Sequence, residues 1–251
     1  MWALLKTRRW IAFTVLVIVA IAAFGLLSRW QWSRADERRA ERTELAAELA
    51  ATPMSAEQAL NIPREWAPVM LTGTYDAERT VLVRQRPLNG ANGFWVATPL
   101  ITDSGTSIWI NRGWLPVTGS ATAVQSAPSP PSGTVTVTGH LRAAESTPSP
   151  APQDLPPGQV PALDPSALGL VGDSATSQAA RFYVELISSQ PAEPDLTPIP
   201  LPEIDEGRNI SYAVQWLLFA AVAIAGWFFF LRREAREDAD TEHQEAPWTS
   251  A

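Results

Sequence analysis

Hydrophobic residues concentrate in two long runs near the ends of this 251-residue chain. Residues 10–27 (WIAFTVLVIVAIAAFGLL) and 212–231 (YAVQWLLFAAVAIAGWFFFL) contain no Asp, Glu, Lys, Arg or His. A helix over either run is roughly 27 to 30 Å long, enough to cross the hydrocarbon core of a bilayer. The pattern predicts two transmembrane helices. A buried core helix is the alternative for either run, and a cleaved signal peptide is a further alternative for the first, which lacks a small-x-small cleavage site.

The chain between these runs has two successive patterns. Residues 33–51 are mostly strong helix formers with acids and arginines three and four positions apart, which predicts a charged helix continuing the first span. From 69 to 188 the pattern changes to short runs rich in β-branched and aromatic residues, separated by turn residues such as Asn89-Gly90. This part predicts an antiparallel β domain. The expected strands are 69–75, 80–86, 94–101, 106–112, 134–142 and 181–188.

Proline is frequent in the remaining connections. Residues 117–132 and 143–180 are rich in Pro, Ser, Ala and Gly, and we expect loops there without a functional site. Residues 190–206 predict an extended, acidic arm that returns the chain to the second span. The expected fold class is therefore a membrane protein in which two transmembrane helices flank a β-rich (α+β) domain.

Charge sets the expected orientation of the spans. Three arginines follow the second span closely, whereas one, Arg208, precedes it, and the positive-inside rule then places the C-terminus in the cytoplasm. Arginines also follow the first span, but a long domain can cross a membrane with little regard to its charge. We expect cytoplasmic segments at 1–9 and 232–251, the latter an acidic tail, and an extracytoplasmic domain at 28–211.

Composition excludes several kinds of chemistry. The chain has no cysteine and only two histidines, His140 and His243, so it has no disulfide, thiolate metal site or cysteine nucleophile, and we expect no metal centre. His140 lies in a predicted strand, where a structural role is favoured over a catalytic one. Neither a carboxylate pair nor a nucleotide-binding spacing stands out. We expect neither an enzyme nor a nucleic-acid partner.

Clusters of Trp, Arg and amide side chains close to the predicted membrane surface carry the candidate site. The ordinary role of tryptophan and tyrosine there is to anchor a protein at the interface. Gln215 differs, because an amide inside an apolar span costs free energy unless it has a partner, so we expect it to face protein or a ligand. The candidate contact residues are Trp30, Gln31 and Arg34 after the first span, Arg112 and Trp114 after a strand, and Tyr212, Gln215 and Trp216 in the second span.

These clusters resemble motifs of the surfeit locus protein 1 family of cytochrome c oxidase assembly factors. Four blocks match in order: RWQWSR at 29–34, LTGTY at 71–75, NRGWLP at 111–116 and SYAVQW at 211–216. The third and fourth together are more specific than either alone. High Ala, Arg and Pro with a single lysine, Lys6, suggest a bacterium with a GC-rich genome, and hence its cell membrane as the location.

The resemblance implies a multi-pass membrane protein that assists heme a insertion into, or maturation of, oxidase subunit I. It implies heme a as a transient cofactor, and subunit I, other oxidase assembly factors and the lipid bilayer as partners. A heme-free scaffold that stabilises an assembly intermediate is the alternative.

Family members have been proposed to ligate heme iron through a histidine three residues before the tyrosine of the fourth block. Here that position is Asn209, whose amide is a poor iron ligand. Contacts to a bound heme would then come from Arg34 or Arg112 to its propionates and from Trp and Tyr rings to the porphyrin.

Overall fold

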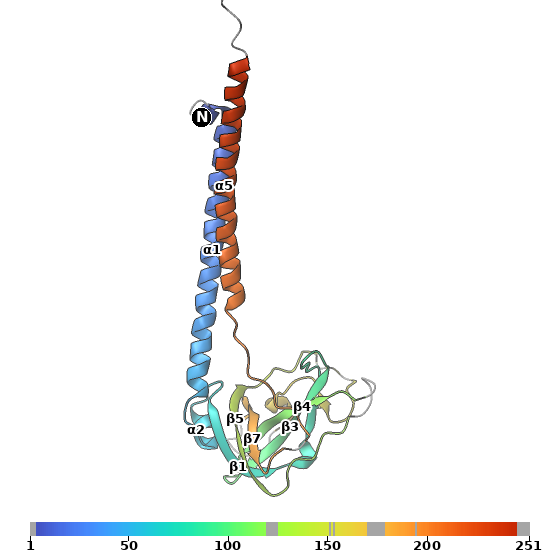
Figure 1. Cartoon of the computed structure of the whole chain (residues 1–251). Helices are drawn as coiled ribbons and strands as arrows, with labels where there is room; N and C mark the ends of the chain where they lie inside the picture. Colours follow the sequence, from blue (N-terminus) through green and yellow to red (C-terminus); the bar gives the residue numbers. More distant parts are fainter. Residues whose placement is uncertain are drawn as a thin grey trace, which may run out of the picture. The chain divides into compact units, whose positions relative to one another are not determined.

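The computed structural model describes residues 4–118, 125–150, 152, 154–169, 179–193 and 195–244, with side chains described as far as residue 237. The chain forms two compact units. One contains residues 1–43 and 203–251, and the other contains residues 44–202. The first is helical and the second is built on a β-sheet (Figure 1).

The helical unit consists of two long helices. A short turn of 3-10 helix, η1 (Leu4–Lys6), precedes α1 (Arg8–Leu49), and α5 (Gly207–Gln244) follows the sheet in the chain. α1 includes the first apolar run and nearly all of the charged stretch expected to continue it. Each helix is long and apolar enough to cross a membrane, and only 6% of each apolar window is buried inside the protein. Such low burial differs from the core helix of a water-soluble domain.

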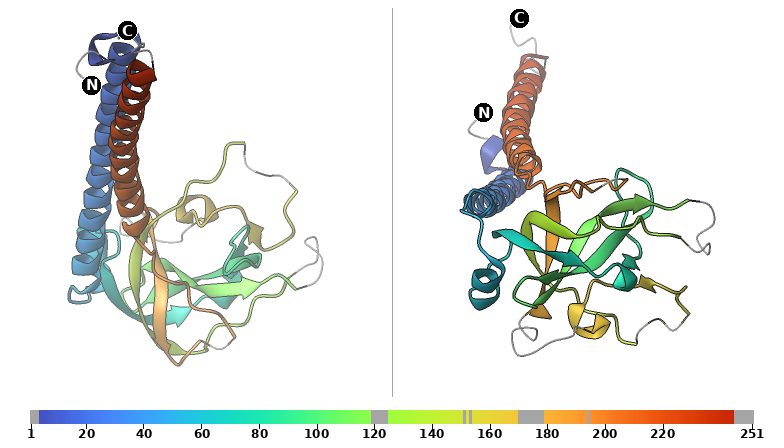
Figure 2. Two further views of the ribbon diagram at one scale, coloured as in Figure 1. Left: turned by 45° about the horizontal axis from the view of Figure 1, so that its top comes forward. Right: turned by 90° about the horizontal axis from the view of Figure 1, so that it is seen from below.

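The two helices pack side by side and antiparallel (Figures 1 and 2). The inward-facing residues of α1 alternate spacings of three and four, the repeat of a coiled-coil seam. They are Trp10, Thr14, Val17, Ile21, Phe24, Ser28, Gln31 and Ala35. The facing row of α5 is Ala213, Trp216, Ala220, Ala223, Trp227, Leu231 and Glu234.

Specific contacts set the register of this helix pair. The Ser28 hydroxyl donates to the Ala213 carbonyl (3.0 Å), and the Trp227 indole donates to the Thr14 hydroxyl (3.0 Å). Between them the Phe24 ring stacks on Trp216 at a centroid distance of 5.8 Å. The pairing of rising numbers on α1 with falling numbers on α5 shows the antiparallel direction.

The second unit begins with α2 (Ala56–Asn61), whose N-terminus is closed by a capping box between Ser55 and Gln58. Seven strands then form one sheet in the order β1-β5-β7-β4-β3-β2-β6. Pairing of β1 with β3 closes five of them, β1, β5, β7, β4 and β3, into a barrel (Figure 2). The strands are β1 (Pro68–Tyr75), β2 (Val81–Val83), β3 (Gly93–Thr102), β4 (Ser107–Pro116), β5 (Thr134–Ala143), β6 (Gln159–Val160) and β7 (Phe182–Gln190), with short helices η2 (Ala77–Arg79) and α3 (Pro165–Leu168).

The expected antiparallel pairing is present in five strand pairs, and two pairs depart from it. β4 pairs with β7 in parallel, and β2 pairs with β6 in parallel. A parallel pair needs a long connection between its strands, and the chain between β4 and β7 contains β5 and both proline-rich stretches. The described part of residues 143–180 contains β6 and α3, where only loops were expected.

The barrel strands bury side chains on both faces. Alternate residues of all five barrel strands form the interior, including Leu71 and Leu141. Their neighbours point outward, where Trp109 and Tyr183 pack against Leu163 of the proline-rich stretch. Leu163 is fully buried. The segment around Leu163 therefore covers part of the outside of the barrel and forms a second hydrophobic cluster there.

Candidate functional site

A groove lies within the helical unit, where α1 passes the first turns of α5. Its volume is about 700 Å³, within the roughly 300 to 1,000 Å³ of small-molecule sites. We call it the helix groove. Its lining is Trp30, Gln31, Arg34, Glu37, Arg38 and Glu41 of α1, Glu203, Ile204 and Asp205 of the arm, and Arg208, Asn209 and Tyr212 of α5.

Helical spacing brings aromatic and cationic groups together at this groove. Trp30 and Arg34 are four residues apart on α1, and the guanidinium carbon lies 5.8 Å from the indole centroid. Arg208 and Tyr212 repeat the same spacing on α5. Trp30 is 54% exposed and Tyr212 is 47% exposed, so both rings can meet a ligand or a partner.

The charges of the helix groove are mixed. Arg34 donates to Glu37 at 2.9 Å, and Arg38 donates to Glu41 at 3.0 Å. Arg208 makes no hydrogen bond or ion pair within the part of the chain that the structure describes, so its guanidinium is the one most open to an anion. The Arg34–Glu37 and Arg38–Glu41 pairs are exposed, so they hold their side chains only weakly.

The groove offers flat rings and guanidinium groups, which suit the porphyrin and propionates of a heme. It contains no histidine or methionine. Asn209 lies half-buried in its wall, and Tyr212 is the only lining residue of a type that ligates heme iron in proteins. His140 is a buried residue of β5 in the other unit. The donor set therefore fits the ring and carboxylates of heme a and lacks an imidazole for its iron.

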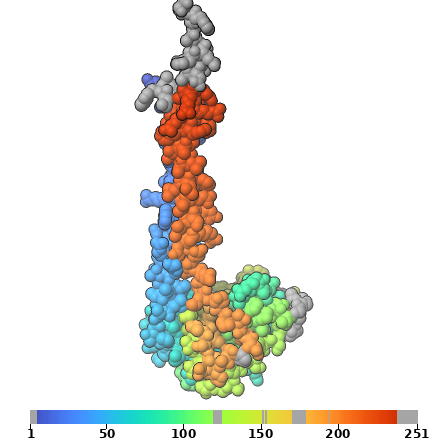
Figure 3. Space-filling model, viewed as in Figure 1, coloured from blue at the N-terminus to red at the C-terminus, as the bar shows by residue number. Residues whose placement is uncertain are grey.

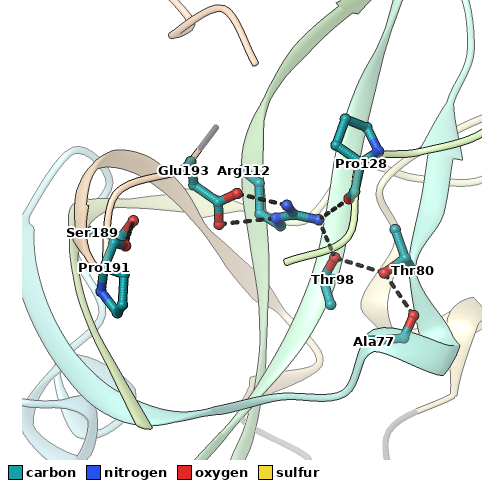
Figure 4. A network of polar contacts seen from close by, with 8 residues as sticks. All are labelled: Ala77, Thr80, Thr98, Arg112, Pro128, Ser189, Pro191 and Glu193. Carbon is teal, nitrogen blue, oxygen red and sulfur yellow. Dashed lines mark hydrogen bonds and ion pairs between the residues drawn. The ribbon is translucent and has the colours of Figure 1, made fainter. Parts of the chain in front are cut away.

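Arg112 lies in β4 of the barrel unit, outside the helix groove. Its guanidinium makes two hydrogen bonds to the Glu193 carboxylate, at 3.0 and 2.6 Å (Figure 4). It also donates to the Pro128 carbonyl at 2.9 Å and the Thr98 hydroxyl at 3.4 Å. Its side chain is 0% exposed. A propionate could reach Arg112 only by displacing Glu193.

Trp114 is also part of the barrel rather than the groove. Its indole donates to the Arg86 carbonyl at 2.6 Å and lies against Gly93, where a Cβ atom would collide with the ring. Its backbone forms a β-bridge with Thr197 of the arm. The NRGW block thus fastens the arm to the barrel through both Arg112 and Trp114.

Gln215 and Trp216 diverge because adjacent helical residues point about 100° apart. Trp216 is half-buried against Phe24. Gln215 is exposed, and its amide has no partner in the described part of the chain. Within this protein, then, Gln215 does not face the other helix.

Several residues of these sites were not among the candidates, including Glu193 and Arg208. Glu193, the partner of Arg112, carries no local signal because it lies 81 residues away in the chain. Arg208 could have been found from its spacing of four residues from Tyr212.

Comparison with known proteins supports the resemblance of the motifs. A family model described as the SURF1 family matches residues 18–221. The chain belongs to the surfeit locus protein 1 (SURF1) family. Uncharacterized SURF1-like proteins of Mycobacterium bovis and Mycobacterium tuberculosis are 30% identical over 261 aligned positions, which cover 98% of this chain and 94% of each relative.

The SURF1 family is generally one of oxidase assembly factors. The matched range of this SURF1 chain includes the whole lining of the helix groove, both barrel residues Arg112 and Trp114, and Gln215. It ends before the acidic tail. The helix groove, Arg112, Trp114 and Gln215 therefore lie in the part that the family model covers.

Proposed function

We propose that this SURF1 protein assists the assembly of a cytochrome c oxidase of the heme-copper type, in heme a insertion into subunit I or its maturation. The observation that carries the proposal is the helix groove. It joins the RWQWSR block after the first apolar run to the SYAVQW block at the second. These blocks come from opposite ends of the chain, and together they present exposed aromatic and guanidinium groups.

The proposal includes insertion of α1 and α5 in the bacterial cell membrane. Because the helices are antiparallel, both termini lie on one side, and the arginines after the second apolar run favour the cytoplasm. The helix groove then lies at the opposite, extracytoplasmic surface. Trp30, Trp32 and Tyr212 stand at that level, where aromatic side chains are commonly enriched.

Asn209 supports a second candidate function, a heme-free scaffold that holds subunit I in an insertion-competent state. The groove without an imidazole favours contact with a polypeptide, or with the ring and carboxylates of heme a, over coordination of iron. Both functions serve oxidase assembly, and they differ in whether the purified protein carries heme.

Deletion of the gene tests the shared proposal. We expect the a-type absorption band of the membranes to weaken, and restoration by the intact gene. Complementation with the Arg208→Ala/Tyr212→Ala protein should restore less of the band than complementation with Arg29→Ala, an exposed arginine outside the groove. Normal oxidase spectra in the deletion strain would refute the proposal.

The spectrum of the purified protein separates the two candidates. Stoichiometric heme a in protein from cells that make it supports heme handling and excludes the heme-free scaffold. Co-purification of subunit I without heme supports the scaffold.

A further inference from the structure

α5 has a second row of residues, which points away from α1. The row alternates spacings of three and four along the exposed side of the helix. It consists of Arg208, Ser211, Gln215, Leu218, Val222, Ala225 and Phe229, and we call it the Gln215 stripe. Leu218, Val222 and Phe229 are 59%, 67% and 62% exposed. Figure 3 shows one face of α5 (orange) uncovered along most of its length.

The amide of Gln215 is the polar group of this stripe inside the apolar run. Its neighbours Leu218 and Phe219 are exposed hydrophobic residues. Ser211 cannot serve it fully, because the Ser211 hydroxyl donates to the Gly207 carbonyl at 2.9 Å. In a membrane an unpartnered amide is costly, and a side chain from a neighbouring helix is its usual partner. We therefore expect the Gln215 amide to find its hydrogen-bond partner outside the described part of the chain.

The positions of polar and apolar residues along the Gln215 stripe indicate which kind of surface would complement it. Arg208 and Gln215 occupy one end, and the rest, from Leu218 to Phe229, is apolar with one small residue, Ala225. A complementary surface is a membrane-spanning helix that is apolar over most of one face and has a hydrogen-bonding side chain near its extracytoplasmic end.

A second copy of this chain fits the stripe poorly. In a symmetric dimer of parallel helices each stripe residue meets its own counterpart. Gln215 would then meet Gln215, but Arg208 would also face Arg208, and like charges oppose association. The charge pattern favours a different protein.

We propose that the Gln215 stripe docks a membrane-spanning helix of oxidase subunit I, with Gln215 hydrogen-bonded to a polar side chain of that helix. The proposal rests on the proposed role in oxidase assembly and names the surface that holds the client. It assigns Gln215 to partner binding, and the stripe shares only Arg208 with the helix groove.

Co-purification tests the role of the amide. Full-length Gln215→Leu protein, expressed with tagged subunit I, should retain about threefold to twentyfold less subunit I than the unchanged protein, the range expected for an interhelical hydrogen bond. Val214→Leu is the matched control, because Val214 is exposed beside Gln215 but outside the stripe. Its yield should not change. Equal retention by Gln215→Leu would overturn the proposal.

Cross-linking tests the surface. A photoreactive residue at Val222, in the stripe, should form an adduct with tagged subunit I, and one at Leu217, exposed on another face, should not. Equal adducts at both positions, or an adduct at Val222 that contains only two copies of this chain, would overturn it. If cross-linking fails at Val222 but the deletion strain has an oxidase defect, only the docking role of the Gln215 stripe is rejected. If the deletion strain has normal oxidase spectra, the assembly function itself is rejected.

Discussion

Arg112 shows how burial changes the meaning of a motif residue. As a sequence feature it suggested a guanidinium available to an anionic ligand. In the barrel its side chain is fully enclosed and shared by Glu193, Thr98 and Pro128 (Figure 4). The Glu193 side chain is itself only 7% exposed, so each buried charge is neutralised mainly by the other.

Replacement of Arg112 by alanine should therefore destabilise the barrel unit by roughly 3 to 5 kcal/mol, because the Glu193 carboxylate would remain buried without a partner. Thermal unfolding of the full-length protein in detergent measures the change. Arg181→Ala is the control, since Arg181 is an exposed residue next to β7 and its loss should cost less than about 0.5 kcal/mol. Equal melting temperatures of the two variants would contradict the role given to Arg112.

The environment of His140 predicts that the stability of the barrel unit depends on pH. Burial in the strand, and then the nearby Arg142, lower the pKa of His140 below its usual 6.5. The unfolded chain thus binds the proton more readily, and the free energy of unfolding should fall as the pH drops below about 6.5 towards the lowered pKa. Glu185, opposite on β7, has a pKa raised by burial and acts in the other direction, losing stability as the pH rises above 4.5.

The His140→Gln protein separates these effects. In this variant the fall in the free energy of unfolding between pH 6.5 and the lowered pKa of His140 should disappear, while the contribution of Glu185 remains. Unfolding curves of both proteins at a series of pH values test this. An unchanged slope in His140→Gln would show that the histidine does not titrate differently in the folded state.

At the scale of elements, the seam between α1 and α5 is the feature that builds the groove. Small Ala213 lets the helices approach, and the hydrogen bond from Ser28 to its carbonyl marks the register. Since Gln31 belongs to the same seam, that register places the RWQWSR block beside the first turns of α5. A shift by one residue would rotate Trp30 and Arg34 away.

The absence of native cysteine makes this register easy to test. A Ser28→Cys/Ala213→Cys protein should form an intramolecular disulfide under mild oxidation, since the side chain of residue 28 touches residue 213 in the seam. Arg29→Cys/Val214→Cys, one position further along each helix and exposed, should not. Electrophoresis with and without reductant gives the readout, and equal oxidation of both pairs would contradict the seam.

For the whole molecule, the antiparallel helix pair links topology to function. If both helices span the membrane, the two termini share one compartment and the barrel occupies the other. The cluster Arg232, Arg233 and Arg236 favours the cytoplasm for the termini. The helix groove and the barrel would then lie at the extracytoplasmic surface, which is where the proposed contact with oxidase subunits would take place.

Reporter fusions examine that arrangement directly. Alkaline phosphatase joined after Pro202 should be active, because it is exported with the barrel, whereas the same enzyme joined at the C-terminus should be inactive. A fluorescent protein at the C-terminus should fluoresce. The reverse pattern would place the barrel and the helix groove in the cytoplasm.

Much of the fold was predictable because its signals are local. Apolar length predicted both long helices, and alternation with turn residues predicted the positions of six strands, each of which overlaps a strand of the sheet. Of the candidate contacts, Trp30, Gln31, Arg34 and Tyr212 do meet in one groove, whereas Arg112 and Trp114 belong to the barrel. Adjacent motif letters gave no indication of that division.

The sequence by itself determined the kinds of element, the chemistry that cannot occur in a chain without cysteine, and the membership of the SURF1 family. Only the tertiary structure decided that the sheet closes into a barrel, that β4 and β7 run parallel, and that the Arg112 guanidinium is paired with the Glu193 carboxylate. Helix and strand patterns arise from neighbours within a few residues. Strand closure and ion pairing depend instead on segments that only the folded chain brings together, so no local periodicity encodes them.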